Sequence, residues 1–126
     1  MTTLVKIGFC ELALGAVLGW GVVARLERPQ LLTRLGIVAP RRILQAHLDY
    51  IMMGIILVAI GLAFGHLSAW IAVPLVFGTW MNPTLFLFEA WGDAVERNTL
   101  FRVVAFLSLT ATSGSLVAVA IDALSR

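Results

Sequence analysis

The chain has 126 residues, of which 60% are apolar and only 13% are charged, and its mean hydropathy is +0.98. A water-soluble domain of this length cannot bury so much apolar surface, so the composition predicts an integral membrane protein. The formal net charge is +2, and the basic residues form no patch interleaved with stacking aromatic side chains, which argues against nucleic-acid binding. The single cysteine, Cys10, excludes an intramolecular disulfide and a cysteine-based zinc or iron–sulfur site.

Four long apolar segments follow one another along the chain. At about 1.5 Å per residue in a helix, each can cross about 30 Å of hydrocarbon. We therefore expect an all-α integral membrane protein, a single domain over residues 1–126 folded as a bundle of four transmembrane helices. The first segment has some features of a signal peptide, but it is long and we expect it to be retained. The expected helices are residues 4–24, 43–64, 70–91 and 100–123.

The first and last segments each carry a stripe of small or polar residues at helical spacing. Such stripes allow helices to approach closely and to form hydrogen bonds across their contact. We therefore expect these two faces to meet, with Glu11 hydrogen-bonded across them. The stripes are Gly8, Glu11, Gly15 and Gly19 in the first segment, and Ser108, Thr112, Ser115 and Asp122 in the last.

The second segment carries two ionisable residues, His47 and Asp49, near its start. Gly54 and Gly61 follow His47 at spacings of seven, so they lie on the same face and leave a groove without side chains. This groove suits either a flat ligand or a closely packed helix, and His47 itself either binds a ligand or bonds another helix. Asp49 lies about 200° around the helix and shares its stripe with Met53, so His47 and Asp49 can serve one site only from neighbouring subunits.

The third segment begins and ends with tryptophans, as expected where indole rings lie at the two lipid–water boundaries, and we expect a kink near Pro83. Asn82 and Glu89 lie two turns apart on one face of this helix. Asn82 either belongs to a site or bonds backbone carbonyls that Pro83 frees. Glu89 either belongs to the same site or, being close to the lipid–water interface, is solvated or pairs with an arginine such as Arg97.

Basic residues are distributed unevenly between the two ends of the four segments. Positive-inside counting therefore predicts that both termini are non-cytoplasmic, in a multi-pass protein of the cell (inner) membrane. The polar residues of the second and third segments then define one site on the cytoplasmic side. Seven basic residues lie at the cytoplasmic end, namely Arg25, Arg28, Arg34, Arg41, Arg42, Arg97 and Arg102, and two lie at the other end, Lys6 and Arg126.

Several common chemistries have no signal in this sequence. It contains no nucleophile elbow, no phosphate-binding glycine loop and no H-E-x-x-H zinc helix. The only other histidine, His66, is about 28 Å from His47 at helical rise. One chain therefore cannot hold a haem between two of its own histidines.

Two short motifs resemble those of the hydroxylaminobenzene mutases and styrene oxide isomerases, a family of small four-helix membrane proteins. The stretch His-Leu-Asp-Tyr-Ile-Met-Met-Gly at residues 47–54 is similar to the family pattern H-L-[ED]-x-x-x-N-G. The stretch Phe-Gly-Thr-Trp-Met-Asn at residues 77–82 is similar to Y-G-T-[WF]-x-N. The resemblance covers the second and third segments, together with the length and the four-helix layout.

This resemblance implies a homotrimer with haem b at its subunit interfaces, the iron being held by His47 and the cofactor contacted by Tyr50 and Gly54. Lewis-acid chemistry at an open iron position would rearrange a small hydrophobic substrate, an aryl epoxide or a hydroxylamine, without net redox change. From position alone, Tyr50 is expected near the lipid–water interface. The residues implied around the substrate pocket are Asp49, Met53, Phe77 and Asn82.

Two positions depart from the family pattern. Met53 stands where the pattern has asparagine and Phe77 where it has tyrosine, and neither can donate a strong hydrogen bond. Met53 as a second axial ligand would favour electron transfer or sensing over catalysis. Three functions therefore stay open: a haem isomerase or mutase, a non-enzymatic haem protein, and a cofactor-free subunit of a membrane assembly whose polar residues lock helices together.

Overall fold

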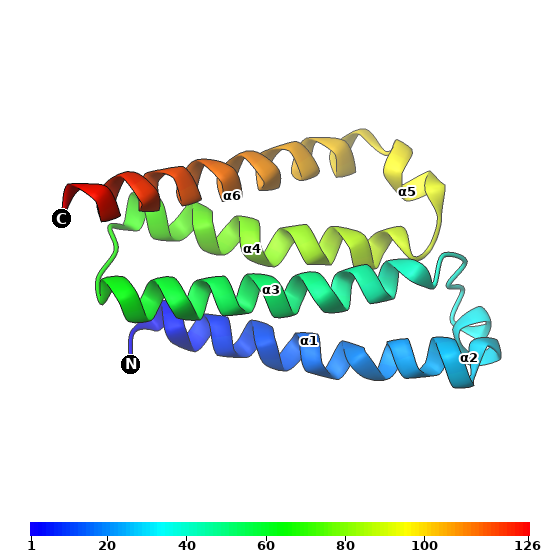
Figure 1. Cartoon of the computed structure of the whole chain (residues 1–126). Helices are drawn as coiled ribbons and strands as arrows, with labels where there is room; N and C mark the ends of the chain where they lie inside the picture. The colour runs from blue at the N-terminus through cyan, green and yellow to red at the C-terminus, as the bar shows by residue number, and fades with distance from the viewer.

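The computed structural model describes residues 1–126 as six helices without a strand. The four long helices are α1 (Thr3–Glu27), α3 (Arg41–Phe64), α4 (Ala69–Glu89) and α6 (Thr99–Ser125), and each is long and apolar enough to cross a membrane. Two short helices, α2 (Pro29–Arg34) and α5 (Asp93–Arg97), lie in the connections at one end of the molecule (Figure 1). The prediction of an all-α protein with four membrane spans is confirmed.

Most apolar side chains of the chain lie on its surface. Only 22 of the 126 residues are buried, and large side chains such as Trp20, Leu62 and Phe106 are largely exposed. All four long helices pair their backbone groups internally, which is the condition for a chain segment to lie in hydrocarbon. The exposed apolar surface therefore faces lipid, and the chain is a multi-pass membrane protein.

The helix ends follow local capping chemistry. The hydroxyl of Thr2 accepts a hydrogen bond from the Val5 amide at the start of α1, and Asn98 caps α6 in the same way. The first helix ends at Glu27, three residues beyond the predicted end, because Arg28 precedes Pro29 and leaves the helical conformation. Pro29 then begins α2, a helix that the apolar pattern did not predict.

The four long helices pack in the order α1, α3, α4, α6, as Figure 1 shows. Helix α1 touches α4 only slightly and does not contact α6. The predicted contact between the stripes of the first and last segments is therefore wrong. The small-residue stripe of α1 packs on α3, whose own glycines permit close approach, and the hydroxyl stripe of α6 packs on α4, which offers an amide partner in Asn82.

Helix α4 continues as one helix through both of its prolines. The Thr84 hydroxyl donates to the Trp80 carbonyl at 2.7 Å, and the Thr79 hydroxyl donates to the Val76 carbonyl at 3.1 Å. Pro83 offers no backbone donor to the Thr79 carbonyl four residues earlier, and these two hydroxyl bonds go to other carbonyls of the same helix.

The connection between α2 and α3 closes one end of the bundle over α4. The backbone amides of Val38 and Ala39 both donate to the carbonyl of Ala90 at 3.0 Å, and the Trp91 indole donates to the Leu35 carbonyl at 3.1 Å. Four buried apolar residues pack beneath this connection. The start of α3, which carries His47 and Asp49, is therefore held firmly against the end of α4.

Candidate functional site

His47 lies on the face of α3 that packs against α1, and its side chain is half-buried. Its Nδ1 atom is 2.6 Å from the carbonyl oxygen of Gly15. A carbonyl oxygen only accepts, so Nδ1 carries a proton, and in the neutral ring Nε2 keeps its lone pair. Nε2 makes no hydrogen bond within the chain. Metal-binding imidazoles are commonly oriented by such a bond to a backbone carbonyl, so Nε2 is the atom that could ligate a metal.

The room for the imidazole comes from the small-residue stripe of α1. A Cβ atom on Gly19 would lie 3.2 Å from Cε1 of His47, so the ring rests against the bare backbone there. A Cβ atom on Gly15 would meet the Ile51 side chain at 2.9 Å. The two glycines therefore let α1 pass close to α3 while one of them orients the histidine.

The glycine groove that follows His47 along α3 is filled by α1. A Cβ atom on Gly54 would lie 2.8 Å from Cγ of Leu12 and 2.9 Å from the carbonyl oxygen of Gly8. Gly61 is covered by the start of α1 in the same way. The sequence left open whether the groove holds a flat ligand or a closely packed helix. Within one chain it holds a helix, α1. A porphyrin bound to His47 would have to lie outside the α1–α3 pair.

Glu11 of α1 is the most unusual polar residue in the bundle. It is 0% exposed, and neither carboxyl oxygen has a hydrogen-bond partner within the chain. It lies near enough to Asp49 and Tyr50 of α3 to interact with both electrostatically. A buried carboxyl group without a partner is costly in an apolar medium. Glu11 and Asp49 therefore form a polar region inside the membrane span, and helix packing alone does not explain their presence there.

Tyr50 joins α3 to α4. Its hydroxyl is 2.5 Å from the Thr84 hydroxyl, and because Thr84 already donates to Trp80, Tyr50 must donate to Thr84. The Tyr50 ring meets the Trp80 ring edge-on, with centroids 6.3 Å apart. Tyr50 is only 2% exposed, so its side chain lies inside the bundle and does not reach the surface of the chain. Its hydroxyl and ring are used to hold two helices together.

Asn82 faces α6. Its amide nitrogen donates to the Thr112 hydroxyl at 3.1 Å, and its amide oxygen accepts from the Ser108 hydroxyl at 2.5 Å. The alternative in which Asn82 bonds carbonyls freed by Pro83 is therefore wrong. Because α3 packs against a different side of α4, Asn82 does not meet His47 within one chain.

The other residues implied around the pocket differ in how much of their side chains is exposed. Phe77 is 39% exposed on the outer surface of α4, whereas Asp49 and Met53 are half-buried on α3. Within one chain Glu11 lies in electrostatic range of Asp49 and Tyr50 without a hydrogen bond to either, and Phe77 and Asn82 lie apart from His47. A site that used all of these residues would need more than one copy of the chain.

Glu89 pairs with Arg42. The two side chains are 2.9 Å apart, and Arg42 also reaches Glu96 at 3.0 Å and Gln45 at 2.8 Å. The prediction that Glu89 pairs with an arginine is confirmed, but the partner is Arg42 and not Arg97, because α5 presents Glu96 to this cluster while Arg97 is exposed. The cluster ties the start of α3 to the end of α4 and to α5.

Sequence reasoning missed three partners at this site: the Gly15 carbonyl, Thr84 and Trp80. The glycine stripe of α1 was the available signal for the first, whereas nothing in the pattern distinguished Thr84 from other hydroxyls. No group of three or more His, Cys, Asp or Glu side chains is placed to hold a metal ion. Within one chain, His47 therefore offers a single imidazole nitrogen, Nε2.

No family model matches the chain, and neither a curated protein nor a solved structure matches it.

Proposed function

We propose that the chain is a membrane protein that binds haem b through Nε2 of His47. The observation that carries the proposal is the bond from Nδ1 of His47 to the Gly15 carbonyl, which sets the ring orientation and leaves Nε2 free. The motif at residues 47–54 supports the same assignment. Since α1 covers the Gly54 face, the cofactor would sit at a contact with a neighbouring copy, and the homotrimer implied by the resemblance provides such a contact.

The proposal includes an activity, the non-redox rearrangement of a small hydrophobic aryl epoxide or hydroxylamine. When bound, the iron would supply Lewis acidity toward the substrate oxygen. From this chain, Asp49 supplies a half-buried polar group inside the span, whereas Glu11 is fully buried within the chain, and the apolar helices exclude water. Met53 and Phe77 offer only apolar contacts, because neither side chain donates a strong hydrogen bond.

The absorption spectrum of the purified protein tests haem binding directly. Protein expressed with ample haem should show a Soret band, and His47→Ala should abolish it. His47→Asn is the matched variant, because its amide can still donate to the Gly15 carbonyl but offers no iron ligand at the position of Nε2. A colourless wild-type protein, or a Soret band that survives both substitutions, would overturn the proposal.

Coordination and turnover separate catalysis from electron transfer or sensing. A five-coordinate ferric spectrum together with isomerisation of an aryl epoxide such as styrene oxide supports the isomerase. A six-coordinate spectrum that Met53→Leu converts to five-coordinate, with a reversible redox couple and no turnover, supports a non-enzymatic haem protein instead.

A second candidate function is a cofactor-free subunit of a membrane assembly. The observation that favours it is that Asn82, Tyr50 and even His47 all form hydrogen bonds between neighbouring helices. In that case the wild-type protein is colourless, and His47→Ala lowers the stability of the bundle without any spectral change.

We also propose that both termini lie on the non-cytoplasmic side of the inner membrane. The seven basic residues counted from the sequence lie at the end that carries α2 and α5, whereas Lys6 and Arg126 lie at the end that carries both termini (Figure 1). A C-terminal alkaline phosphatase fusion should be active and a C-terminal green fluorescent protein fusion dark. The opposite pair of results would reverse the orientation.

A further inference from the structure

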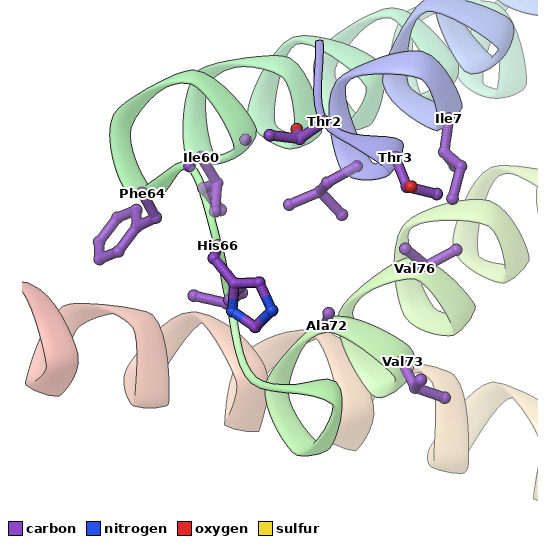
Figure 2. A pocket seen from close by; sticks show the side chains of 13 residues that line it. Thr2, Thr3, Ile7, Ile60, Phe64, His66, Ala72, Val73 and Val76 are labelled. Atoms are coloured by element: carbon purple, nitrogen blue, oxygen red, sulfur yellow. The ribbon is translucent and has the colours of Figure 1, made fainter.

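A cavity of about 550 Å³ opens at the end of the bundle opposite His47. The start of α1, the end of α3, the following loop and the start of α4 enclose it, as Figure 2 shows. Thirteen residues line it, and none of them is an aspartate, glutamate, lysine or arginine. Its volume is typical of pockets that bind small organic molecules.

Two polar side chains reach this cavity without a partner in the chain. The Thr2 hydroxyl is used by the Val5 amide, but the hydroxyl of Thr3 and the imidazole of His66 form no hydrogen bond within the chain. In Figure 2 the His66 ring extends from the loop into the space between α1 and α4, near Ala72. The cavity therefore combines an apolar wall with two uncharged hydrogen-bonding groups.

Glycines fix the shape of the cavity. Gly65 has a φ of +64°, a conformation that few other residues adopt, and it turns the chain so that His66 lies over the cavity. A Cβ atom on Gly61 would lie 2.6 Å from Val5, so this glycine lets the start of α1 rest on α3 and form one wall. The space is thus a consequence of close helix packing and is present before any ligand binds.

We propose that this cavity binds a small uncharged amphiphile, an alcohol or phenol with one apolar body. The body would lie among Ile7, Ile60 and Val73, and its hydroxyl would bond Thr3 and His66. A charged ligand would find no free counter-ion, because no charged residue lines the cavity and Arg126, whose guanidinium lies over the Phe64 ring, is paired with Asp122. A hydrocarbon would form no hydrogen bond with the exposed residues Thr3 and His66. The site is independent of haem binding, because His47 and His66 are about 28 Å apart at helical rise.

Photolabelling in lipid nanodiscs tests this site at the level of single residues. The probe is a benzyl alcohol that carries a trifluoromethyl diazirine, and labelled positions are read by mass spectrometry. We expect labelling concentrated on the cavity lining and competed by unlabelled benzyl alcohol. The benzoate analogue of the probe should not label the lining. The proposal would be overturned if the probe labelled all lipid-facing residues to the same extent, or if the benzoate labelled the lining as strongly as the alcohol.

Two substitutions make the test specific to the cavity. Ala72→Phe fills it and should abolish labelling of the lining, whereas Ala69→Phe, one turn earlier on the exposed surface of α4, should not. His66→Phe keeps the bulk of the ring but loses its hydrogen bond, and should weaken labelling by the alcohol about fivefold while leaving a probe without the hydroxyl unaffected. Labelling of the same residues by a phospholipid with a photoreactive acyl chain, undiminished by benzyl alcohol, would show that lipid fills the space and would refute the assignment.

Discussion

The α1–α3 contact and the α4–α6 contact hold two helix pairs together by different means. The first is a contact between backbones, with His47 as its one side-chain hydrogen bond. A Cβ atom added at any of its six glycines would lie within 3.2 Å of an atom of the other helix. The second has one such close approach, at Gly78, where a Cβ atom would lie 2.8 Å from the Thr112 amide nitrogen, and it adds polar side chains, because one amide bonds two hydroxyls. The six glycines of the first contact are Gly8, Gly15, Gly19, Gly21, Gly54 and Gly61.

This difference distinguishes polar residues whose presence inside the membrane is explained by helix packing from those whose presence is not. Ser108, Thr112 and Asn82 satisfy one another, so their presence inside the membrane needs no ligand. Between α1 and α3 the glycines already provide close approach, yet His47 keeps one nitrogen free and Glu11 keeps both oxygens unpaired. The polar residues of the α1–α3 contact are therefore the better evidence of function.

The largest effect is expected from breaking the backbone contact. Gly54→Leu places a side chain against Leu12 and the Gly8 carbonyl, where backbone lies on both sides and cannot move cheaply. We expect the free energy of unfolding to fall by about 3 kcal/mol. Unfolding measured by steric trapping in mild detergent would give this value.

Gly114→Leu is the matched control for that substitution. Gly114 lies on α6 with open space where its Cβ would stand. The same change there should alter the free energy of unfolding by no more than about 0.5 kcal/mol. Equal losses at the two glycines would mean that leucine disturbs the helix itself and not the α1–α3 contact.

A smaller effect is expected from breaking the polar contact. Asn82→Leu removes two bonds to α6, but Thr112 still donates to the Ser108 carbonyl and so keeps a partner. We expect a loss of about 1 kcal/mol, and a coupling of about 0.6 kcal/mol in a double-mutant cycle with Thr112→Val. Thr110→Val, on the exposed side of α6, should show no coupling with Asn82→Leu. Zero coupling at Thr112 would contradict the amide–hydroxyl bond.

The four spans were predictable because the length of an apolar run alone decides whether it crosses the membrane. The sequence did not allow us to predict which of these helices pack against one another. The glycine stripe of α1 showed that something packs closely there, but small residues do not identify their partner, and Glu11 was assigned to α6 instead of α3. The short helices α2 and α5 were missed because each lies in a polar connection without apolar periodicity.

The candidate site was predictable in the identity of its intramembrane polar residues and not in their pairing. His47, Asp49 and Glu11 stand out because ionisable groups in a span are costly. That Arg42 and not Arg97 meets Glu89 depends on how α5 turns, which is a tertiary property. A single chain also carries no sequence signal for the contact between copies that a haem at His47 would need.

The smallest stability effect is expected at His47 itself. His47→Asn retains a donor for the Gly15 carbonyl, and the glycines continue to hold α1 on α3, so the free energy of unfolding should change by about 0.6 kcal/mol or less. Steric trapping of both variants would compare the free energy of unfolding of His47→Asn with that of Asn82→Leu. A loss larger than that of Asn82→Leu would mean that the imidazole bond, and not the backbone contact, joins the two helices. With stability preserved, disappearance of the Soret band in the same variant assigns His47 to the cofactor and removes helix locking as its main role.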